Sequence, residues 1–567
     1  MSRGFEADLS SGKIMSVAPL RSSVPASGSS RGWIISSWLD QLLIVLTPLL
    51  VIPAVLFLHK PIGVKAETIA LVVTAFFAIG HHLPGLIRAY GDAELFRRFR
   101  WRFLLAPPVF LIAYFPLIYY HRDFYPFVIL LWATWHGLMQ LYGFVRIYDA
   151  KVGSVSYATA YWDWLVCLCG FVTIEAFSPS RSAFMLNSWY SLGGPLIPAT
   201  AISICRWCCL GVSIFILTGF VINYVVQWKR GPRPNPIKLL LLASGIGSWW
   251  VAIGYLENAI LGAALFDICH DVQYVAIVWL YNCRRVNSNT EISGFMKYVF
   301  RRGMVLFYLG LIAAYGSIGL IPALVQNGTM ITFFNGILGT STLLHYYYDG
   351  FIWKVRERST QASLGLNENS TSPSVRQMTA GGMPHLLKWS PLIGAVGWLF
   401  LMNASEPSLL QSRKDELEQL YTRTLSGTTV LPETVEERSW VYSIFERVQN
   451  IATAVPDDRL SQLHAAAMLA NFGRNDEAMT LLEKLLTRDP GCSEGHTFLG
   501  AINMFSGNLD KASACFQMAL THATLDSERA MAHLKLGEVY QLQHDRESAE
   551  LRFEEALRGQ STAEDRN

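Results

Sequence analysis

The sequence predicts an all-α protein that consists of a polytopic transmembrane helix bundle followed by a water-soluble helical tail. Only 16% of the 567 residues are charged and 51% are apolar, whereas soluble proteins have roughly 25% charged residues. Charge is also divided along the chain, because residues 403–567 hold 26 acidic and 16 basic residues, and residues 1–402 hold 17 and 30. We therefore expect a basic part in a lipid bilayer with an acidic tail, and no recruitment to nucleic acid.

The apolar part, residues 33–402, contains eleven runs long enough to cross a bilayer, which takes about 20 residues. The expected spans are 33–58, 66–88, 103–120, 124–146, 157–177, 200–227, 236–255, 258–283, 303–325, 330–353 and 386–402. Residues 1–32 are polar and rich in serine, without the apolar core of a signal peptide. We expect them to be a disordered segment.

Basic residues alternate between successive connections and so predict an orientation. The N-terminal segment and the connections after the second, sixth, eighth and tenth spans are basic, and the connections after odd-numbered spans hold few Lys or Arg. The alternation is weakest at the connection after the fourth span, which offers Arg146 and Lys151. Because basic loops stay in the cytoplasm, we expect a cytoplasmic N-terminus and an extracytoplasmic tail, periplasmic or lumenal. One miscounted span would reverse the side of the tail.

The tail repeats with a period of 34 to 37 residues. Gly473, Ala478 and Leu482 recur 34 residues later as Gly507, Ala512 and Phe516, and Ala512, Phe516 and Ala519 recur 37 residues later as Ala549, Phe553 and Ala556. Together with Leu499-Gly500 and Leu536-Gly537-x-x-Tyr540, this pattern resembles the tetratricopeptide repeat (TPR). The resemblance implies an α-solenoid of helix pairs over residues 459–563, with repeats at 459–492, 493–526 and 530–563, after a helical linker at 403–458. It further implies a groove that binds a protein or peptide partner.

Five histidines lie inside predicted spans, and those spans all run in the same direction. They are His81 and His82 in 66–88, His136 in 124–146, His270 in 258–283 and His345 in 330–353. Each precedes a basic residue at the cytoplasmic boundary, which places all five roughly 10–20 Å from that boundary at about 1.5 Å per residue. Ionisable side chains in hydrocarbon are costly and mark functional sites. We therefore expect the histidines to converge.

Acidic residues accompany these histidines. Asp349 follows His345 by four residues, on the same helix face, and Asp271 follows His270 directly. Pro84 lacks an amide donor for the carbonyl of Gly80, so we expect a kink beside His81 and His82. Imidazole suits iron, copper and zinc, and carboxylates favour harder oxidation states. The predicted metal site consists of His81, His82, His136, His270, His345, Asp271 and Asp349.

The histidine pattern is similar to that of membrane oxygenases and desaturases with histidine boxes, whose metal lies near the cytoplasmic face. Dense boxes of the His-x-x-His-His kind are absent, which excludes an eight-histidine di-iron site and leaves a mixed histidine and carboxylate site. The interpretation is a membrane metalloprotein with iron, as a di-iron centre, and with zinc, copper or haem as alternatives. It would be an oxidoreductase for a lipid-like substrate, whose anionic head group would contact Arg88, Arg146 and Arg284.

Other interpretations remain open from the sequence alone. The histidines can be independent residues that form hydrogen bonds between helices, or two of them can ligate haem. Four intramembrane acids, Asp163, Asp267, Asp271 and Asp349, can serve a proton-coupled transporter as relay groups. The chain can also be a membrane-anchored TPR assembly scaffold without catalytic activity, whose tail recruits a partner.

Overall fold

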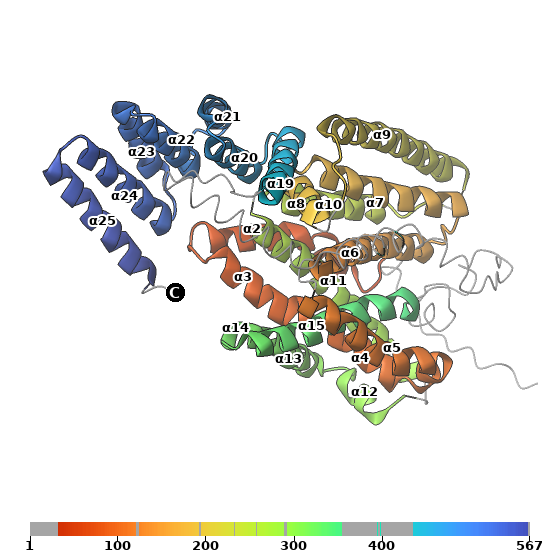
Figure 1. Cartoon of the computed structure of the whole chain (residues 1–567). Helices are drawn as coiled ribbons and strands as arrows, with labels where there is room; N and C mark the ends of the chain where they lie inside the picture. The colour runs from red at the N-terminus through yellow and green to blue at the C-terminus, as the bar shows by residue number, and fades with distance from the viewer. Residues whose placement is uncertain are drawn as a thin grey trace, which may run out of the picture.

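The computed structural model describes residues 32–120, 124–191, 194–231, 233–256, 258–288, 292–353 and 435–564, with single positions 364, 394 and 397. The prediction of an all-α fold is confirmed for these residues, in which the one extended pairing is an isolated bridge between Asp92 and Ile292. Apolar helices form a bundle, and the tail helices extend from one side of it (Figure 1).

The bundle contains α-helices interrupted by short π-helical and 3-10 segments. In chain order these elements are α1 (Ser37–Asp40), η1 (Gln41–Val45), α2 (Thr47–His59), α3 (Ala66–Val73), η2 (Thr74–Ile79), α4 (His82–Gly91), α5 (Ala93–Tyr120), α6 (Phe124–Lys151), α7 (Tyr157–Phe177), α8 (Pro179–Ser191), α9 (Ala199–Arg230), α10 (Ile237–Trp249), η3 (Trp250–Tyr255), α11 (Ala259–Ser288), α12 (Gly294–Val299), α13 (Val305–Gly316), η4 (Ser317–Leu320), α14 (Ile321–Leu324) and α15 (Gly328–Ile352).

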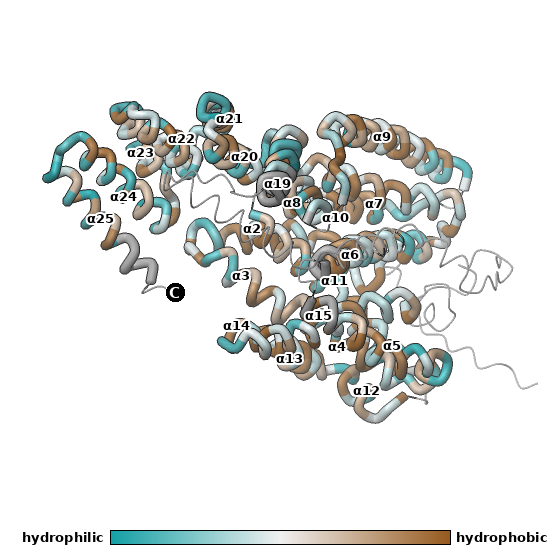
Figure 2. The backbone as a smooth tube through the Cα atoms, viewed as in Figure 1, coloured by the Kyte–Doolittle hydropathy of each residue, from teal (hydrophilic) through white to brown (hydrophobic). Residues whose placement is uncertain are grey.

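Seven helical stretches in the described part of the chain are long and apolar enough to cross a membrane. They are Ala66–Gly91, Val128–Lys151, Tyr157–Phe177, Ala199–Arg230, Ile237–Tyr255, Ala259–Asn287 and Val305–Leu324. Ser37–Val45 and Thr47–His59, bent by 51°, together make an eighth candidate. The apolar residues of these helices appear brown in Figure 2. Seven or eight candidate spans are typical of an integral membrane protein.

The other three of the eleven predicted spans are not among these candidates. Predicted span 103–120 lies in α5, which begins ten residues earlier and includes four arginines between residues 97 and 102. Predicted span 330–353 corresponds to α15, whose polar residues include His345 and Asp349. Predicted span 386–402 lies outside the described residues, apart from positions 394 and 397.

The helical segment that carries His81 and His82 is irregular at the position where Pro84 predicts a kink. The π-helical segment η2 ends at Ile79, a turn follows at Gly80 and His81, and α4 begins at His82. The carbonyl of Gly80 accepts from the amide of Leu83 at 3.2 Å, since Pro84 has no amide hydrogen. This turn places His81 outside the regular helix.

Close packing against α13 and η4 fixes this irregular segment. A Cβ atom on Gly316 would lie 2.2 Å from the carbonyl oxygen of Ala75, and a Cβ atom on Gly80 would lie 3.0 Å from that of Ile312. Only glycine permits backbones to approach so closely at these positions. The segment before His81 is thus held by direct backbone contact in addition to the packing of its side chains.

The tail forms one helix, α19 (Val435–Ala454), followed by three helix pairs. The pairs are α20 (Arg459–Asn471) with α21 (Asn475–Arg488), α22 (Ser493–Phe505) with α23 (Leu509–His522), and α24 (Asp526–Leu542) with α25 (Arg546–Glu564). The first two pairs lie within the predicted repeats 459–492 and 493–526, whereas α24 begins four residues before the predicted third repeat, 530–563; α19 lies within the predicted linker. In each pair the turn contains one residue with positive φ: Gly473 (70°), Gly507 (80°) and His544 (62°).

Helix α19 attaches the tail to the bundle. Its Ile451, Ala454 and Val455 pack against Ala183, Leu186 and Tyr190 of α8. The side-chain oxygen of Asn450 accepts from the amide of Ala199 at 3.0 Å, at the start of α9. The tail therefore contacts the connection between α7 and α9.

Candidate metal centre

Four of the predicted histidines converge at one point inside the bundle. His81 precedes α4, His136 lies on α6, His270 on α11 and His345 on α15. Each offers one ring nitrogen, and these four atoms all lie within 4.8 Å of one another. Four separate helices thus supply one group of nitrogens that can hold a metal ion.

His345 lies at the centre of this group. Its Nε2 is 3.0 Å from Nε2 of His81 and 3.1 Å from Nε2 of His136. His270 completes the group, with ring centroids 5.0 Å from His136 and 5.5 Å from His81. Four of the ring pairs meet edge to face.

Two carboxylates contact three of the four histidines. Oδ1 of Asp271 lies 2.9 Å from Nδ1 of His81, which is the arrangement that orients a metal-binding imidazole. Oδ2 of Asp349 lies 3.7 Å from Nε2 of His345 and 3.9 Å from Nε2 of His136. Asp271 therefore orients a histidine from outside, and Asp349 faces the nitrogens themselves.

Asp349 is held by two residues that the sequence analysis did not identify. Its Oδ1 accepts hydrogen bonds from Tyr274 at 3.0 Å and from the indole nitrogen of Trp353 at 2.9 Å. Sequence spacing could have predicted both residues, because Tyr274 follows His270 by four residues and Trp353 follows Asp349 by four, which places each pair on one helix face.

Some buried polar atoms of the centre lack a hydrogen-bond partner among the described residues. They are Oδ2 of Asp271 and Nδ1 of His345, on side chains that are 1% and 3% exposed. Buried polar groups are normally paired, and unpaired ones call for an explanation such as a bound ion or water. The hydrogen bonding of this centre is thus incomplete within the protein itself.

His82 lies beside the four histidines but outside their group of nitrogens. Its ring stacks on His345, with centroids 4.7 Å apart and an interplanar angle of 21°. Its Nδ1 is 3.0 Å from Oγ of Ser341, which is 2.7 Å from the hydroxyl of Tyr315. All seven predicted metal-site residues are therefore brought together, in different positions relative to the four nitrogens.

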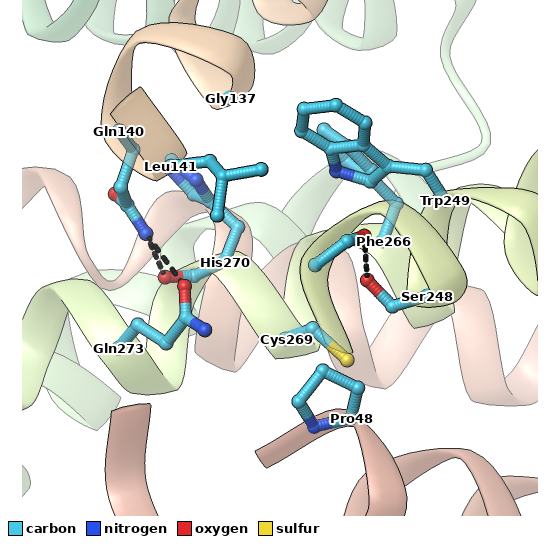
Figure 3. A pocket seen from close by; sticks show the side chains of 11 residues that line it. Pro48, Gly137, Gln140, Leu141, Ser248, Trp249, Phe266, Cys269, His270 and Gln273 are labelled. Carbon is cyan, nitrogen blue, oxygen red and sulfur yellow. Dashed lines mark hydrogen bonds between the residues drawn. The ribbon is translucent and has the colours of Figure 1, made fainter. Parts of the chain in front are cut away.

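A small cavity of about 30 Å³ adjoins His270. Figure 3 shows Gln140 and Gln273 on one side of it and Trp249 on the other, with Pro48 of the bent α2 segment below. The side-chain nitrogen of Gln140 donates to the carbonyl of His270 at 2.9 Å, which fixes α6 against α11. The cavity has room for water-sized molecules and not for haem.

The three predicted head-group arginines lie in different surroundings. Arg88 is 3% exposed and approaches the ring of Trp353, the residue that donates to Asp349, to 4.0 Å. Arg146 forms ion pairs with Asp149 at 3.0 Å and with Asp163 at 2.8 Å. Nη2 of Arg284 lies 3.4 Å from the carbonyl oxygen of Ile34, to which it donates. Of the three, only Arg88 is connected to the histidines through the contacts described above.

A second buried polar cluster escaped the sequence analysis. Lys238, fully buried on α10, lies 2.8 Å from Asp149 and 3.0 Å from Asp163. Asp163, one of the four predicted relay acids, is therefore paired with two cations, Lys238 and Arg146. Lys238 could have predicted this cluster, because it is a charged residue inside the predicted span 236–255 and a buried charge needs a partner. We call Arg146, Asp149, Asp163 and Lys238 the ion-pair cluster.

Chemically, the four nitrogens and two carboxylates form a donor set that suits a first-row transition metal. Comparison of the chain with family models, with curated proteins and with solved structures gives no match. The proposal for the function is consequently argued from the site alone.

Proposed function

We propose that this chain is a membrane-embedded metalloenzyme, an oxidoreductase that acts on a lipid-like substrate at the centre formed by His81, His136, His270 and His345. The observation that carries the proposal is the convergence of four ring nitrogens within 4.8 Å, each from a different helix. A neutral imidazole nitrogen takes part in one N–H···N hydrogen bond, whereas Nε2 of His345 lies 3.0 Å from Nε2 of His81 and 3.1 Å from Nε2 of His136. A shared cation would use all of these nitrogens at once.

The energetics of burial support a cation at this position. Burying Asp271 and Asp349 costs several kcal/mol for each ion unless opposite charge compensates it. Within the described residues no Lys or Arg lies within ion-pair distance of either carboxylate. A divalent or trivalent metal ion would supply that charge and would also use the nitrogens that now face one another.

Iron is the metal that we propose. Metal–nitrogen bonds of about 2.1 Å place neighbouring ligands about 3.0 Å apart on a six-coordinate ion and about 3.4 Å apart on a tetrahedral one. Two of the separations, 3.0 and 3.1 Å, are closer to the six-coordinate value, and all four atoms lie within 4.8 Å of one another. Four histidines on a six-coordinate iron leave two positions for other ligands, as a catalytic centre requires, whereas four on tetrahedral zinc leave none. A second iron, as in the predicted di-iron centre, would draw on His82, Asp271 or Asp349.

We also propose eleven spans, a cytoplasmic N-terminus and an extracytoplasmic TPR-like tail. Support comes from contacts between connections, which fall into two sets. One set includes Asn235 with Gly32 and Lys151 with Leu364, and the other includes Ser178 with Ile253 and Asn450 with Ala199. Leu364 belongs to the first, basic set and α19 to the second, so the chain needs one further crossing between them. Residues 386–402 are the apolar run available for it.

This topology predicts opposite results for reporters fused at two points. Alkaline phosphatase, which is active only outside the cytoplasm, should be active after residue 567 and inactive after residue 364, and green fluorescent protein should show the reverse. The same reporter active at both points would contradict the crossing at 386–402. In this arrangement the tail would bind its protein partner outside the cytoplasm.

Elemental analysis of the detergent-purified full chain tests the metal centre. The test variant replaces His136 and His345 with Ala, and the matched control replaces two tail histidines, His496 and His522, with Ala. After expression with iron, zinc, copper and manganese supplied, we expect one equivalent of iron in the unmodified protein and in the control, and none in the test variant. Two equivalents would indicate a di-iron centre.

Folding of each variant is checked by size-exclusion chromatography and circular dichroism. Absence of metal from the unmodified protein would overturn the proposal, as would a test variant that is folded and fully loaded. Zinc in place of iron would keep the metal centre and overturn the redox assignment, because zinc does not change its oxidation state.

A further inference from the structure

Arg88 is a buried cation whose hydrogen bonding is incomplete. It lies in the last turn of α4 and is 3% exposed. Its Nε and Nη1 have no hydrogen-bond partner in the part of the chain that the structure describes, while Nη2 donates to the hydroxyl of Tyr281 at 2.7 Å. A guanidinium carries five N–H donors, so most of the donor capacity of Arg88 is unused.

Two aromatic rings form a corner around this guanidinium. The Cζ atom of Arg88 lies 4.1 Å from the ring centroid of Tyr281 and 4.0 Å from that of Trp353. The two rings meet edge to face, with an interplanar angle of 84°. Contact with aromatic faces stabilises a desolvated cation. It offers no acceptor to the N–H groups at the edges of the guanidinium.

The acidic residues near Arg88 are engaged elsewhere. Asp349 accepts from Tyr274 and Trp353 and faces the histidine nitrogens. Asp92 and Glu94 pair with Arg285, at 3.0 and 2.6 Å. If Asp349 serves the metal, Arg88 carries a positive charge that the surrounding protein does not neutralise. Such a charge is costly in a protein interior and attracts an anion.

We propose that Arg88 binds the oxyanion head group of an amphiphilic substrate, a carboxylate or a phosphate monoester, whose apolar chain extends toward the histidines. This inference rests on the proposed function and names the substrate class. Arg88 and His81 are seven residues apart, about 10 Å along the helix axis. Gly85, between them, brings the backbone of α4 close to this part of the centre: a Cβ atom there would lie 3.2 Å from the hydroxyl oxygen of Tyr274 and 3.8 Å from Oδ1 of Asp349. A head group at Arg88 would hold part of an acyl chain near the metal.

The position of Arg88 favours an amphiphile over a free ion. The next turn carries the polar pairs of Asp92 and Glu94 with Arg285, which mark the boundary of the bundle. On the other side, Ile87 packs into an apolar cluster with Ile312 and Phe300. A molecule with one charged end and a long apolar end matches this change from polar to apolar surroundings.

Binding of four probes to the detergent-purified full chain, measured by the shift in melting temperature, tests the inference. The probes are oleate, oleoyl lysophosphatidic acid, uncharged oleyl alcohol and inorganic phosphate. We expect at least one of the two anionic lipids to bind about tenfold or more tightly than oleyl alcohol, because charge-assisted hydrogen bonds are strong. Inorganic phosphate should not compete at equal concentration.

Three variants assign the effect to Arg88. Arg88→Gln should lose the preference for the anionic lipids, and Arg88→Lys should keep part of it, since lysine retains charge without the planar fork. The control is Arg102→Gln, which removes an exposed arginine near the same boundary and should behave like the unmodified protein. If Arg88→Gln does not fold, Arg88→Lys still tests the inference, because its preference for the anionic lipids should be several-fold weaker than that of the unmodified protein.

Metal content, measured in the same samples, separates this inference from the proposed function. Arg88→Gln should retain its metal, and the variant lacking His136 and His345 should lose metal but still prefer anionic lipids. Equal binding of oleate and oleyl alcohol, or an unchanged preference in Arg88→Gln, would overturn the inference. Stabilisation by inorganic phosphate alone would overturn the assignment to a lipid.

Discussion

The histidine group and the ion-pair cluster are both buried in the bundle and share helix α6, yet they differ in how many of their polar atoms have a partner within the protein. In the ion-pair cluster two cations face two carboxylates, and Lys238 contacts both Asp149 and Asp163. The backbone amide of Asn235 adds a further donor to Asp149 at 3.0 Å. In the histidine group, nitrogens face nitrogens.

Such a difference is expected between a structural polar cluster and one that binds a ligand. A buried network is stable when each charge and each donor has a partner, and the ion-pair cluster pairs its charges through α6, α7, α10 and the backbone amide of Asn235. In the histidine group, Oδ2 of Asp271 and Nδ1 of His345 have no hydrogen-bond partner among the described residues. Burial and polarity are therefore shared by both clusters, and the unpaired atoms distinguish them.

The largest effect is expected from Lys238→Met. Methionine is similar in volume, but its substitution leaves two buried carboxylates facing a single cation, Arg146. Breaking a buried ion pair in this way costs about 3–5 kcal/mol, so the melting temperature should fall by several degrees. Metal content per folded molecule should stay unchanged.

The matched control for this variant is Lys229→Met, which removes an exposed lysine at the end of α9. The control should alter the melting temperature little. Equal melting temperatures for the two variants would show that the ion-pair cluster is not a structural requirement, and loss of metal from Lys238→Met would remove the distinction between the clusters.

A smaller effect, on metal affinity, is expected from Asp271→Asn. The amide cannot support the imidazole of His81 as the carboxylate does, and loss of such an outer partner weakens metal binding about 10- to 100-fold. Stability without metal should not fall, because the substitution removes a buried charge with an unpaired oxygen. Competition with a coloured chelator measures the affinity.

Asp267→Asn is the control for this measurement, because Asp267 lies one turn earlier on α11 and makes no contact within ion-pair distance of the four histidines. It should keep the affinity of the unmodified protein. A control that loses as much affinity as Asp271→Asn would mean that charge on α11, rather than the contact with His81, sets the affinity.

Much of the fold could be predicted from hydropathy. The predicted span 157–177 and helix α7 (Tyr157–Phe177) coincide, because a continuous apolar run is bounded by polar residues on both sides. The start of α5 at Ala93 could not be predicted in this way. Its first turns are rich in arginine, a good helix former. The helix therefore begins before the apolar run from which hydropathy predicts the span.

The site could be predicted in composition but not in arrangement. The sequence predicted that the five histidines converge, because they lie at comparable depth in spans that run in the same direction. Which four would share a centre depends on rotation about the helix axis, and the turn at Gly80 and His81 changes that rotation locally. The pairing of Lys238 with Asp163 escaped prediction because the two residues are 75 positions apart and lie on different helices.

The smallest effect is expected from His82→Gln, which tests the boundary of the histidine group. The prediction from sequence placed His82 among the ligands, whereas its ring stacks on His345 and its Nδ1 faces Ser341. Loss of the stacking should cost up to about 1 kcal/mol of stability. Metal affinity should change by less than the roughly tenfold minimum expected for Asp271→Asn. A loss of metal as complete as that of the His136 and His345 double variant would make His82 a fifth ligand and would favour a second metal ion.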